Sequence, residues 1–231
     1  MVNKASKQRT RAVDKRLVCN STPISLPFPC ISSKADVASH DLLVDQIILL
    51  HNILTRTECQ AFIKMIDTLP LQLTPQKKRG EAERVNYRFS LQSAAFAENL
   101  CALLLPHLPE LDTGNGMSRP VSCNSNIRLY KYTPSQFFGA HYDDSVVDPT
   151  TGAKSEWTVL VYLSGIEDGV EGGETIFYKS ERKKQNETII APLTRGTALL
   201  HRHGQQCLLH EGSRVRKGIK YVLRSDLMFS T

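Results

Sequence analysis

This chain of 231 residues has a single tryptophan, few aromatic residues and no long apolar run. Aromatic residues make up 7% of the chain and hydrophobic residues 41%, which is an ordinary composition for a globular protein. The longest apolar stretch, "LLVDQIILL", is broken by Asp45 and Gln46 and falls short of the roughly 18 residues that a membrane-spanning helix needs. We therefore expect no membrane span and enough apolar residues for a substantial core.

The six cysteines show no CxxC spacing, and the basic segment "MVNKASKQRTRAVDKRL" has no apolar stretch of the kind found in signal peptides. Together these features predict reduced thiols in an intracellular protein, cytoplasmic or nuclear. The net charge of +6 is only a weak indication of an acidic partner, because part of the excess lies in this basic segment. Nothing in the sequence predicts the oligomeric state.

The order of segments along the chain predicts a leader followed by one domain. Residues 1–35 are basic and then proline-rich, which is typical of a disordered leader and linker, and we assign 36–231 to a single domain. Within it, a capping box and helical spacing of apolar residues predict a helix over 55–69. A second helix is expected over 92–105, and the charged segment 71–90 between them is expected to be a loop.

From about residue 121 the sequence changes to short β-rich segments separated by turn residues. They read "SNIRLYKYT", "EWTVLVYLS", "ETIFYKS", "ETIIAPL", "GTALLHR" and "KYVLRSDLMF". Helices followed by many short strands indicate an α+β chain whose second part is a jelly-roll or barrel. Gly172 and Gly173 predict a tight turn within it, because no helix start follows them.

His141 and Asp143 lie two residues apart in "GAHYDD", so on a strand they project from the same face. With a third ligand from another strand they would form the facial triad that leaves open positions on Fe(II). His210, in "CLLHEG", is a candidate for that ligand. The His-X-Asp pattern alone is weak support, because it arises by accident in about one third of chains of this composition.

Three longer segments carry a resemblance to a known family. They are "YKYTPSQFFGAHYDD", "TVLVYLSGIEDGVEGGETIF" and "RGTALLH…LLHEGSRVRKGIKYVLRSDLMF". In this order they resemble the iron-binding strand, the following strands and the last strands of prolyl 4-hydroxylase-type iron(II)/2-oxoglutarate dioxygenases. The resemblance covers about residues 120–229. It implies a double-stranded β-helix (jelly-roll) core, braced by the N-terminal helices.

The resemblance also implies site residues. His141, Asp143 and His210 would hold Fe(II), and Lys220, ten residues after the distal histidine, would pair with the far carboxylate of 2-oxoglutarate. Tyr132 and Thr175 would hydrogen-bond the same carboxylate. Arg224 shares a strand face with Lys220 and is an alternative anchor, because nucleic-acid demethylases of this superfamily use an arginine; the spacing favours Lys220.

A second histidine pair left another reading open. His201 and His203, in "LLHRHG", also share a strand face, and with His210 they would make an all-histidine zinc site. We prefer a barrel-lining role for the pair, close enough to orient a ligand. Cys207, near His210, is also a candidate zinc ligand, and for it too we prefer a barrel-lining role.

The implied activity is hydroxylation of a C–H bond, with dioxygen consumed and 2-oxoglutarate decarboxylated to succinate. A prolyl-type peptidyl side chain is the leading substrate class, and ascorbate is a candidate reductant. The alternatives are hydroxylation of a small molecule, demethylation of nucleic acid, and a non-catalytic jelly-roll that binds 2-oxoglutarate or metal. The 71–90 segment and "DDSVVDPTTGAKSE" are candidate substrate loops, with Asn86, Arg88, Asn126, Arg128 and Asp144 as candidate residues at the mouth.

Overall fold

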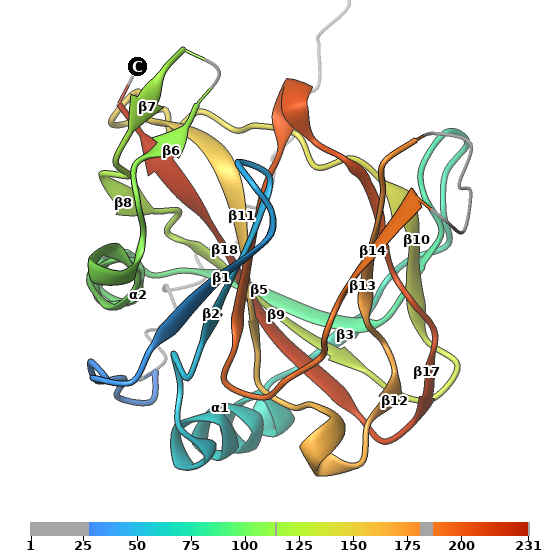
Figure 1. Cartoon of the computed structure of the whole chain (residues 1–231). Coiled ribbons are helices and arrows are strands. Elements are labelled where there is room, and N and C mark those ends of the chain that lie inside the picture. The colour runs from blue at the N-terminus through green and yellow to red at the C-terminus, as the bar shows by residue number, and fades with distance from the viewer. Residues whose placement is uncertain (1–27, 114, 181–186, 231) are drawn as a thin grey trace, which may run out of the picture.

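Two antiparallel sheets face each other, and helices cover the outer face of the larger one (Figure 1). This computed structural model describes residues 28–113, 115–180 and 187–230. Residues 1–27 of the predicted leader lie outside the described residues. All strand pairs in the described residues are antiparallel, which agrees with a jelly-roll rather than with a βαβ arrangement.

The larger sheet spans nine strands. In spatial order these are β1 (Ala38–Leu43), β2 (Ile47–His51), β15 (Ala198–Arg202), β11 (Lys154–Tyr162), β18 (Lys220–Phe229), β9 (Asn126–Tyr132), β5 (Tyr87–Gln92) and β3 (Gln72–Leu73), with β8 (Ser122–Cys123) paired to β18. Strands from both ends of the chain therefore lie side by side.

The smaller sheet carries five strands. Its order is β14 (Thr188–Ala191), β13 (Thr175–Tyr178), β16 (Leu209–Gly212), β10 (Phe137–His141) and β4 (Arg84–Val85). Two two-stranded sheets complete the described strands: β12 (Glu171–Gly172) with β17 (Val215–Lys217), and β6 (Leu111–Asp112) with β7 (Met117–Ser118).

Apolar side chains of the larger sheet point alternately into two cores. On β2, Ile48 and Leu50 pack with the helices, whereas Ile47 and Leu49 pack between the sheets. This is the two-residue period of a strand buried on both faces. The second core adjoins the interior of the barrel, and the functional residues lie there.

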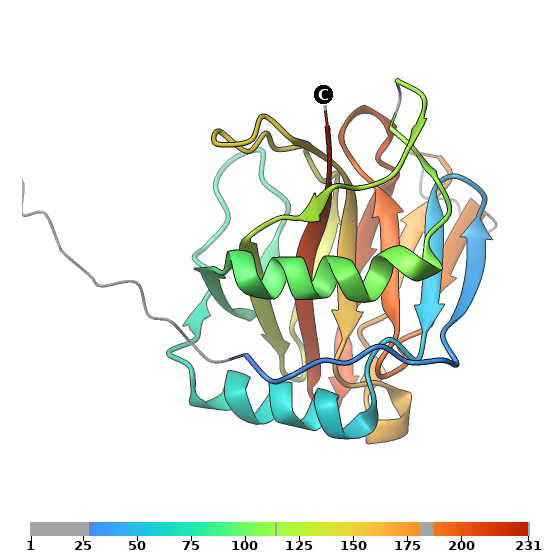
Figure 2. The same cartoon turned by 90° about the vertical axis from the view of Figure 1, so that its left-hand side faces the viewer.

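Helices α1 (Arg56–Thr68) and α2 (Ala94–Leu104) cross one face of the larger sheet (Figure 2). Thr55 and Glu58 form the expected capping box of α1, and Ser93 caps α2. Short 3-10 segments occur at Leu105–His107, Ile166–Asp168 and Gly204–Gln206. None of the helices in the described part of the chain is long and apolar enough to cross a membrane.

Most sequence predictions of the fold are confirmed, including both helices and the jelly-roll. Gly172 ends β12 and Gly173 follows it, and both have the positive φ that glycine favours, 78° and 80°. The predicted loop over 71–90 is wrong in part, because β3, β4 and the start of β5 lie in it. β3 and β4 are edge strands of only two residues each, so the charged segment shows no periodic pattern there. The hairpin of β1 and β2 was not predicted.

Candidate metal and cosubstrate site

Pairing of β10 with β16 places the two predicted histidine ligands opposite each other. His141 is the register partner of His210, and an irregularity in the ladder lies between Phe138 and His141. The ring of Phe138 stacks on the His141 ring with a centroid distance of 3.6 Å. The ring centroids of His141 and His210 are 4.3 Å apart. Strand register thus joins residues that lie 69 positions apart in the sequence.

Asp143 lies two residues beyond the end of β10 and completes the predicted set. Its Oδ1 lies 3.6 Å from His141 Nε2, and its Oδ2 lies 3.7 Å from His210 Nε2. One donor atom from each of the three residues lies within 4.8 Å of the others. Asp143 and His210 are buried, and His141 is half-buried. The three side chains therefore converge closely enough to share one ion.

Backbone carbonyls determine which nitrogen of each histidine is available. Nδ1 of His141 lies 2.9 Å from the Gly139 oxygen, and Nδ1 of His210 lies 2.9 Å from the Leu208 oxygen. A carbonyl only accepts, so each Nδ1 donates, and the neutral ring keeps a lone pair on Nε2. Burial lowers the pKa of both rings, that of His141 to about 3, so both are neutral near pH 7. Neutral imidazoles with free Nε2 atoms are suited to bind a metal ion.

Asp143 carries a full charge in this buried place because its neighbours compensate it. Burial raises its pKa, but Arg224 and the nearby histidines outweigh that effect and hold the pKa well below its usual range. Arg224 donates to Oδ1 over 3.0 Å, and Thr158 donates to Oδ2 over 2.9 Å. Asp143 is therefore an oriented carboxylate, as a metal ligand needs to be.

A chain of hydrogen bonds through Thr158, His203 and Ser155 orients the Asp143 carboxylate. Because Thr158 donates its hydroxyl proton to Asp143, its oxygen accepts from Nδ1 of His203, 2.9 Å away. Nε2 of His203 then accepts from the Ser155 hydroxyl, also at 2.9 Å. Both nitrogens of His203 are thus engaged. The alternative zinc set of His201, His203 and His210 is therefore not supported for His203, because hydroxyl groups engage both of its ring nitrogens.

Lys220 is buried in the same core, at the start of β18. Its Nζ donates to the Gly173 oxygen over 2.5 Å and lies 5.4 Å and 5.5 Å from the ring centroids of Tyr132 and Tyr162. Burial lowers its pKa to about 8. Within the described residues no carboxylate forms an ion pair with Lys220. A buried ammonium without an anion is costly, which suits a site that binds an anionic ligand.

The other predicted cosubstrate residues lie around Lys220. Tyr132 and Thr175 line one inner cavity together with Lys220, His141, His210 and Arg224. Thr175 Oγ1 lies 2.7 Å from the hydroxyl of Tyr162. Arg224 differs from Lys220, because it already contacts the carboxylates of Asp143 and Asp226.

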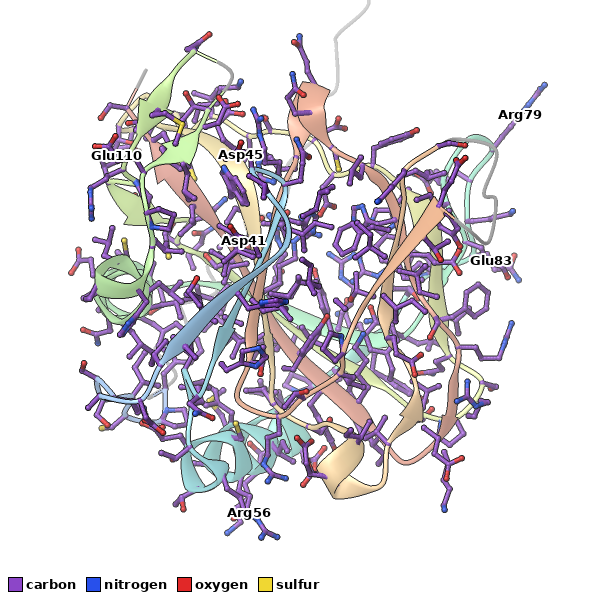
Figure 3. All side chains as sticks on the ribbon, in the orientation of Figure 1. Asp41, Asp45, Arg56, Arg79, Glu83 and Glu110 are labelled. Atoms are coloured by element: carbon purple, nitrogen blue, oxygen red, sulfur yellow. The ribbon has the colours of Figure 1, made fainter. Side chains whose placement is uncertain are left out.

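A wider cavity of about 740 Å³ opens beside the donor residues. Residues of the 74–88 segment form one wall, and Asp144, Tyr142 and Leu209 contribute to the remainder. Arg79, on this segment, points away from the molecule in Figure 3, whereas Glu83 lies nearer the β10 edge. Of the predicted mouth residues, Arg88 and Asp144 line this cavity, and Asn126 and Arg128 line a different one. Asn86 is fully buried and accepts from Arg84 instead.

Arg84 is a site residue that sequence reasoning missed. Its guanidinium carbon lies 4.4 Å from the ring centroids of both Tyr130 and Phe138, and it lines both cavities. Stacking on two rings holds a cation in a fixed orientation between the inner and outer cavities. It was overlooked because it lies among charges in "EAERVNYRF"; the alternation of Arg84, Asn86 and Arg88 is the only signal that could have indicated an inward face.

A jelly-roll with a His-X-Asp pair at the end of one strand and a distal histidine on the neighbouring strand of the sheet is the arrangement of a non-haem iron oxygenase. Residues 127–225 match the model of the 2OG-Fe(II) oxygenase superfamily. Over these 99 residues, which include the three donor residues and Lys220, the chain is similar to this superfamily of 2-oxoglutarate-dependent dioxygenases, which are oxidoreductases. Members of the family use Fe(II) and 2-oxoglutarate. A search of curated proteins finds no match to this chain.

Solved structures agree on the fold at low sequence identity. The viral collagen prolyl hydroxylase of Paramecium bursaria Chlorella virus-1 shares 19% identity at a TM-score of 0.52, covering 80% of this chain and 97% of its own. A Pseudomonas putida prolyl-4-hydroxylase shares 13% sequence identity at a TM-score of 0.54, and the match covers 83% of this chain and 96% of that protein. A Trichoplax adhaerens prolyl hydroxylase, in complex with a hypoxia inducible factor peptide fragment, shares 14% sequence identity at a TM-score of 0.53. The match covers 80% of this chain and 84% of that protein. The fold is therefore of the prolyl 4-hydroxylase type.

Proposed function

We propose that this protein hydroxylates a C–H bond of a peptidyl side chain of prolyl type, with Fe(II) held by His141, Asp143 and His210. The observation that carries the proposal is the convergence of these three donor groups across the β10–β16 pair. Two imidazoles with lone pairs directed at one oriented carboxylate fit a divalent ion such as Fe(II). When bound, iron, 2-oxoglutarate and dioxygen supply the oxidising chemistry, with succinate as a product and ascorbate as the reductant that maintains Fe(II).

Lys220 is proposed to anchor the far carboxylate of 2-oxoglutarate. It is the buried cation in this cavity that forms no ion pair with the described residues, whereas Arg224 is engaged by two carboxylates. Thr175 and the Tyr162 hydroxyl form a polar pair in the same core, and Tyr132 lies beside Lys220. We therefore assign Thr175 and Tyr132 as hydrogen-bonding partners of that carboxylate. Arg224 positions Asp143.

The substrate class is proposed from the outer cavity and from the relatives. The cavity adjoins His141 and is wide and polar, with Arg84, Arg88 and Asp144 among its lining residues, so it suits a segment of polypeptide. The similar structures include prolyl hydroxylases named for collagen and for a hypoxia inducible factor peptide. The engagement of Arg224 weighs against the arginine-anchored nucleic-acid demethylase.

The reaction class is tested by anaerobic purification, loading with Fe(II), and measurement of succinate and carbon dioxide released from 2-oxoglutarate in air, with and without ascorbate. Wild type should release both, and His141→Ala and Asp143→Ala should release neither. His40→Ala, at an exposed histidine on β1, is the matched control and should behave as wild type. Release that persists in His141→Ala and in Asp143→Ala would exclude this assignment.

The substrate class is tested with the same loaded enzyme. Peptide libraries, metabolite extracts and single-stranded oligonucleotides are incubated separately, and products that gain one oxygen are sought by mass spectrometry. We expect the gain on a proline-containing peptide. A gain of oxygen only in the metabolite extract would instead indicate a small-molecule hydroxylase. Loss of a methyl group from an oligonucleotide would indicate a nucleic-acid demethylase.

A further inference from the structure

The guanidinium of Arg84 is held in place by its surroundings. Its Cζ lies 4.4 Å from the ring centroids of both Tyr130 and Phe138, and its Nε donates to Asn86 Oδ1 over 2.9 Å. Asn86 is itself fully buried, and its Nδ2 donates to the Tyr87 carbonyl oxygen over 2.9 Å. Two rings and a buried amide therefore determine the orientation of the guanidinium.

These surroundings do not neutralise the charge of Arg84. Its Nη2 is buried and makes no hydrogen bond in the part of the chain that the structure describes. Within residues 28–113, 115–180 and 187–230, no carboxylate forms an ion pair with Arg84. Tyr130 and Tyr132 lie close to it, but a phenol is neutral near pH 7. A buried cation without an anion is costly, so Nη2 indicates a place for an acceptor from outside the chain.

Arg84 lies where both cavities meet the candidate metal site. It lines the inner cavity that contains Lys220 and also the outer cavity of about 740 Å³. Phe138, on which it stacks, also stacks on the His141 ring at a centroid distance of 3.6 Å. One aromatic ring thus separates the guanidinium from a proposed iron ligand. A group bound to Arg84 would therefore lie close to the C–H bond that is oxidised.

2-Oxoglutarate is a competing occupant, because it also carries carboxylates. Lys220, Tyr132 and Thr175 line the inner cavity and do not line the outer one. Arg84 is half-buried and lines both cavities, so its guanidinium can be reached from the outer cavity, which we assign to the substrate. This difference favours the substrate as the partner of Arg84.

The outer cavity carries an excess of positive charge among its described lining residues. Its cations are Lys77, Arg84, Arg88 and Arg224, and its carboxylates are Glu81, Asp143 and Asp144. Because Arg224 and Asp143 pair with each other, three cations remain against two carboxylates. Of these three, Arg84 alone also lines the inner cavity. The charge excess attracts an anionic group, and Arg84 is placed to bind it nearest the metal site.

We propose that Arg84 is a specificity-determining residue that binds a carboxylate of the substrate, so that the peptide carries an acidic group beside the residue that is hydroxylated. This inference rests on the proposed function, since it takes the same site and the same peptidyl substrate. The carboxylate is that of an aspartate or glutamate side chain, or that of the peptide's carboxyl terminus. A guanidinium pairs with either through parallel N–H···O bonds, and the fixed orientation of Arg84 lowers the entropic cost of the contact.

The inference is tested by peptide binding without turnover. Protein loaded anaerobically with Mn(II) and 2-oxoglutarate selects peptides from a library that has one fixed proline and random neighbours, prepared with free and with amidated carboxyl termini. Wild type should enrich Asp and Glu over Asn and Gln at one position by roughly 10- to 100-fold, the range for a hydrogen bond to a charged group. If the terminal carboxylate is the ligand, free termini should be enriched over amides by the same factor.

Variants of Arg84 separate its role from that of the cavity as a whole. Arg84→Gln should abolish the enrichment, and Arg84→Lys, which keeps the charge, should retain part of it. Arg56→Gln removes the same charge from an exposed position on α1 (Figure 3) and should select peptides as wild type does. The Kd for 2-oxoglutarate, measured by isothermal titration, should remain that of wild type in Arg84→Gln. Circular dichroism reports folding, and Arg84→Lys carries the comparison if Arg84→Gln misfolds.

The outcomes distinguish this inference from the proposed function. Equal enrichment of acids and amides by wild type, no enrichment of any peptide, or an acidic preference that survives in Arg84→Gln would overturn the role of Arg84. Loss of 2-oxoglutarate affinity in Arg84→Gln as large as that in Lys220→Met would assign Arg84 to the cosubstrate and also overturn it. Succinate release that His141→Ala abolishes would leave the proposed function intact in each of these cases. Absence of release by wild type would refute the proposed function, even if acidic peptides are selected through Arg84.

Discussion

Arg224 donates from Nη1 to Asp143 Oδ1 over 3.0 Å, which joins β18 to the residue that follows β10. The same guanidinium reaches Asp226, whose other oxygen contacts Arg128 at 3.3 Å. Four residues earlier on the same strand, Lys220 has no such anion among the described residues. Of two cations on one strand face, Arg224 is thus neutralised by carboxylates and Lys220 forms no ion pair, and this difference can be measured.

Replacing each cation by methionine should change stability in opposite directions. Arg224→Met leaves the buried Asp143 carboxylate without its cation and should lower the free energy of unfolding of the metal-free protein by about 3–5 kcal/mol. Lys220→Met removes an unpaired buried charge and should leave that free energy unchanged or raise it. Urea unfolding monitored by circular dichroism measures both. Equal destabilisation by the two changes would show that Lys220 has an internal counter-charge.

The affinity for 2-oxoglutarate should fall as pH rises through about 8. Lys220 must carry its proton to pair with the carboxylate, and burial lowers its pKa to about 8 in the free protein. One pH unit higher, about a tenth of the lysine is charged, so affinity near pH 9 should be about tenfold weaker. Isothermal titration with Mn(II)-loaded protein measures it, and Lys220→Arg should show no such decline.

The same pKa predicts the pH dependence of stability. In the unfolded chain Lys220 has its ordinary pKa of 10.5, so between pH 8 and 10.5 the unfolded state binds more protons than the folded state. The unfavourable contribution of this lysine is therefore complete below pH 8 and is relieved as pH rises through that window. Wild type should gain free energy of unfolding relative to Lys220→Met between these values. If the free energies of unfolding of wild type and Lys220→Met do not converge over this pH range, Lys220 is not a buried cation without an ion pair.

Gly173 should tolerate no side chain. It has φ of 80°, and a Cβ would lie 3.1 Å from both Lys220 Cδ and Val215 Cγ2. Gly169 has φ of 77° but open space around it, so Gly169→Ala measures backbone strain alone, about 1–3 kcal/mol. Gly173→Ala should cost more than this and should also weaken 2-oxoglutarate binding, which Gly169→Ala should not. Identical effects of both alanines would argue against close packing around Lys220.

Thr158→Val should weaken metal binding although it touches no metal. It removes the donor to Asp143 Oδ2 and leaves Nδ1–H of His203 without its acceptor. Loss of such a partner typically lowers metal affinity 10- to 100-fold. Thr158→Ser keeps the hydroxyl and should retain most of the affinity, measured with Co(II). If Thr158→Val binds Co(II) as tightly as wild type, the hydrogen bonds of Thr158 do not contribute to metal binding.

The two-residue spacing of His141 and Asp143 indicated a candidate pair of ligands, but it was weak support alone because so short a pattern also arises by accident. The resemblance of three longer segments to a known family implied the other predicted site residues, His210, Lys220, Tyr132 and Thr175. The pairing of Arg224 with Asp143 was not predictable, since it joins residues 81 positions apart through strand order. His201 and His203 were grouped by alternation, but β15 ends between them and only His201 faces the donors. The hairpin of β1 and β2 escaped notice because β2 is buried on both faces and shows no alternation.

The most direct test of the central claim is a crystal structure of the protein with Mn(II) in place of Fe(II) and with 2-oxoglutarate. Anomalous scattering should place one ion within ligand distance of His141 Nε2, an Asp143 oxygen and His210 Nε2, and the far carboxylate of 2-oxoglutarate should contact Lys220 Nζ. An ion bound elsewhere, or a carboxylate held by Arg224 with Lys220 left alone, would contradict the account.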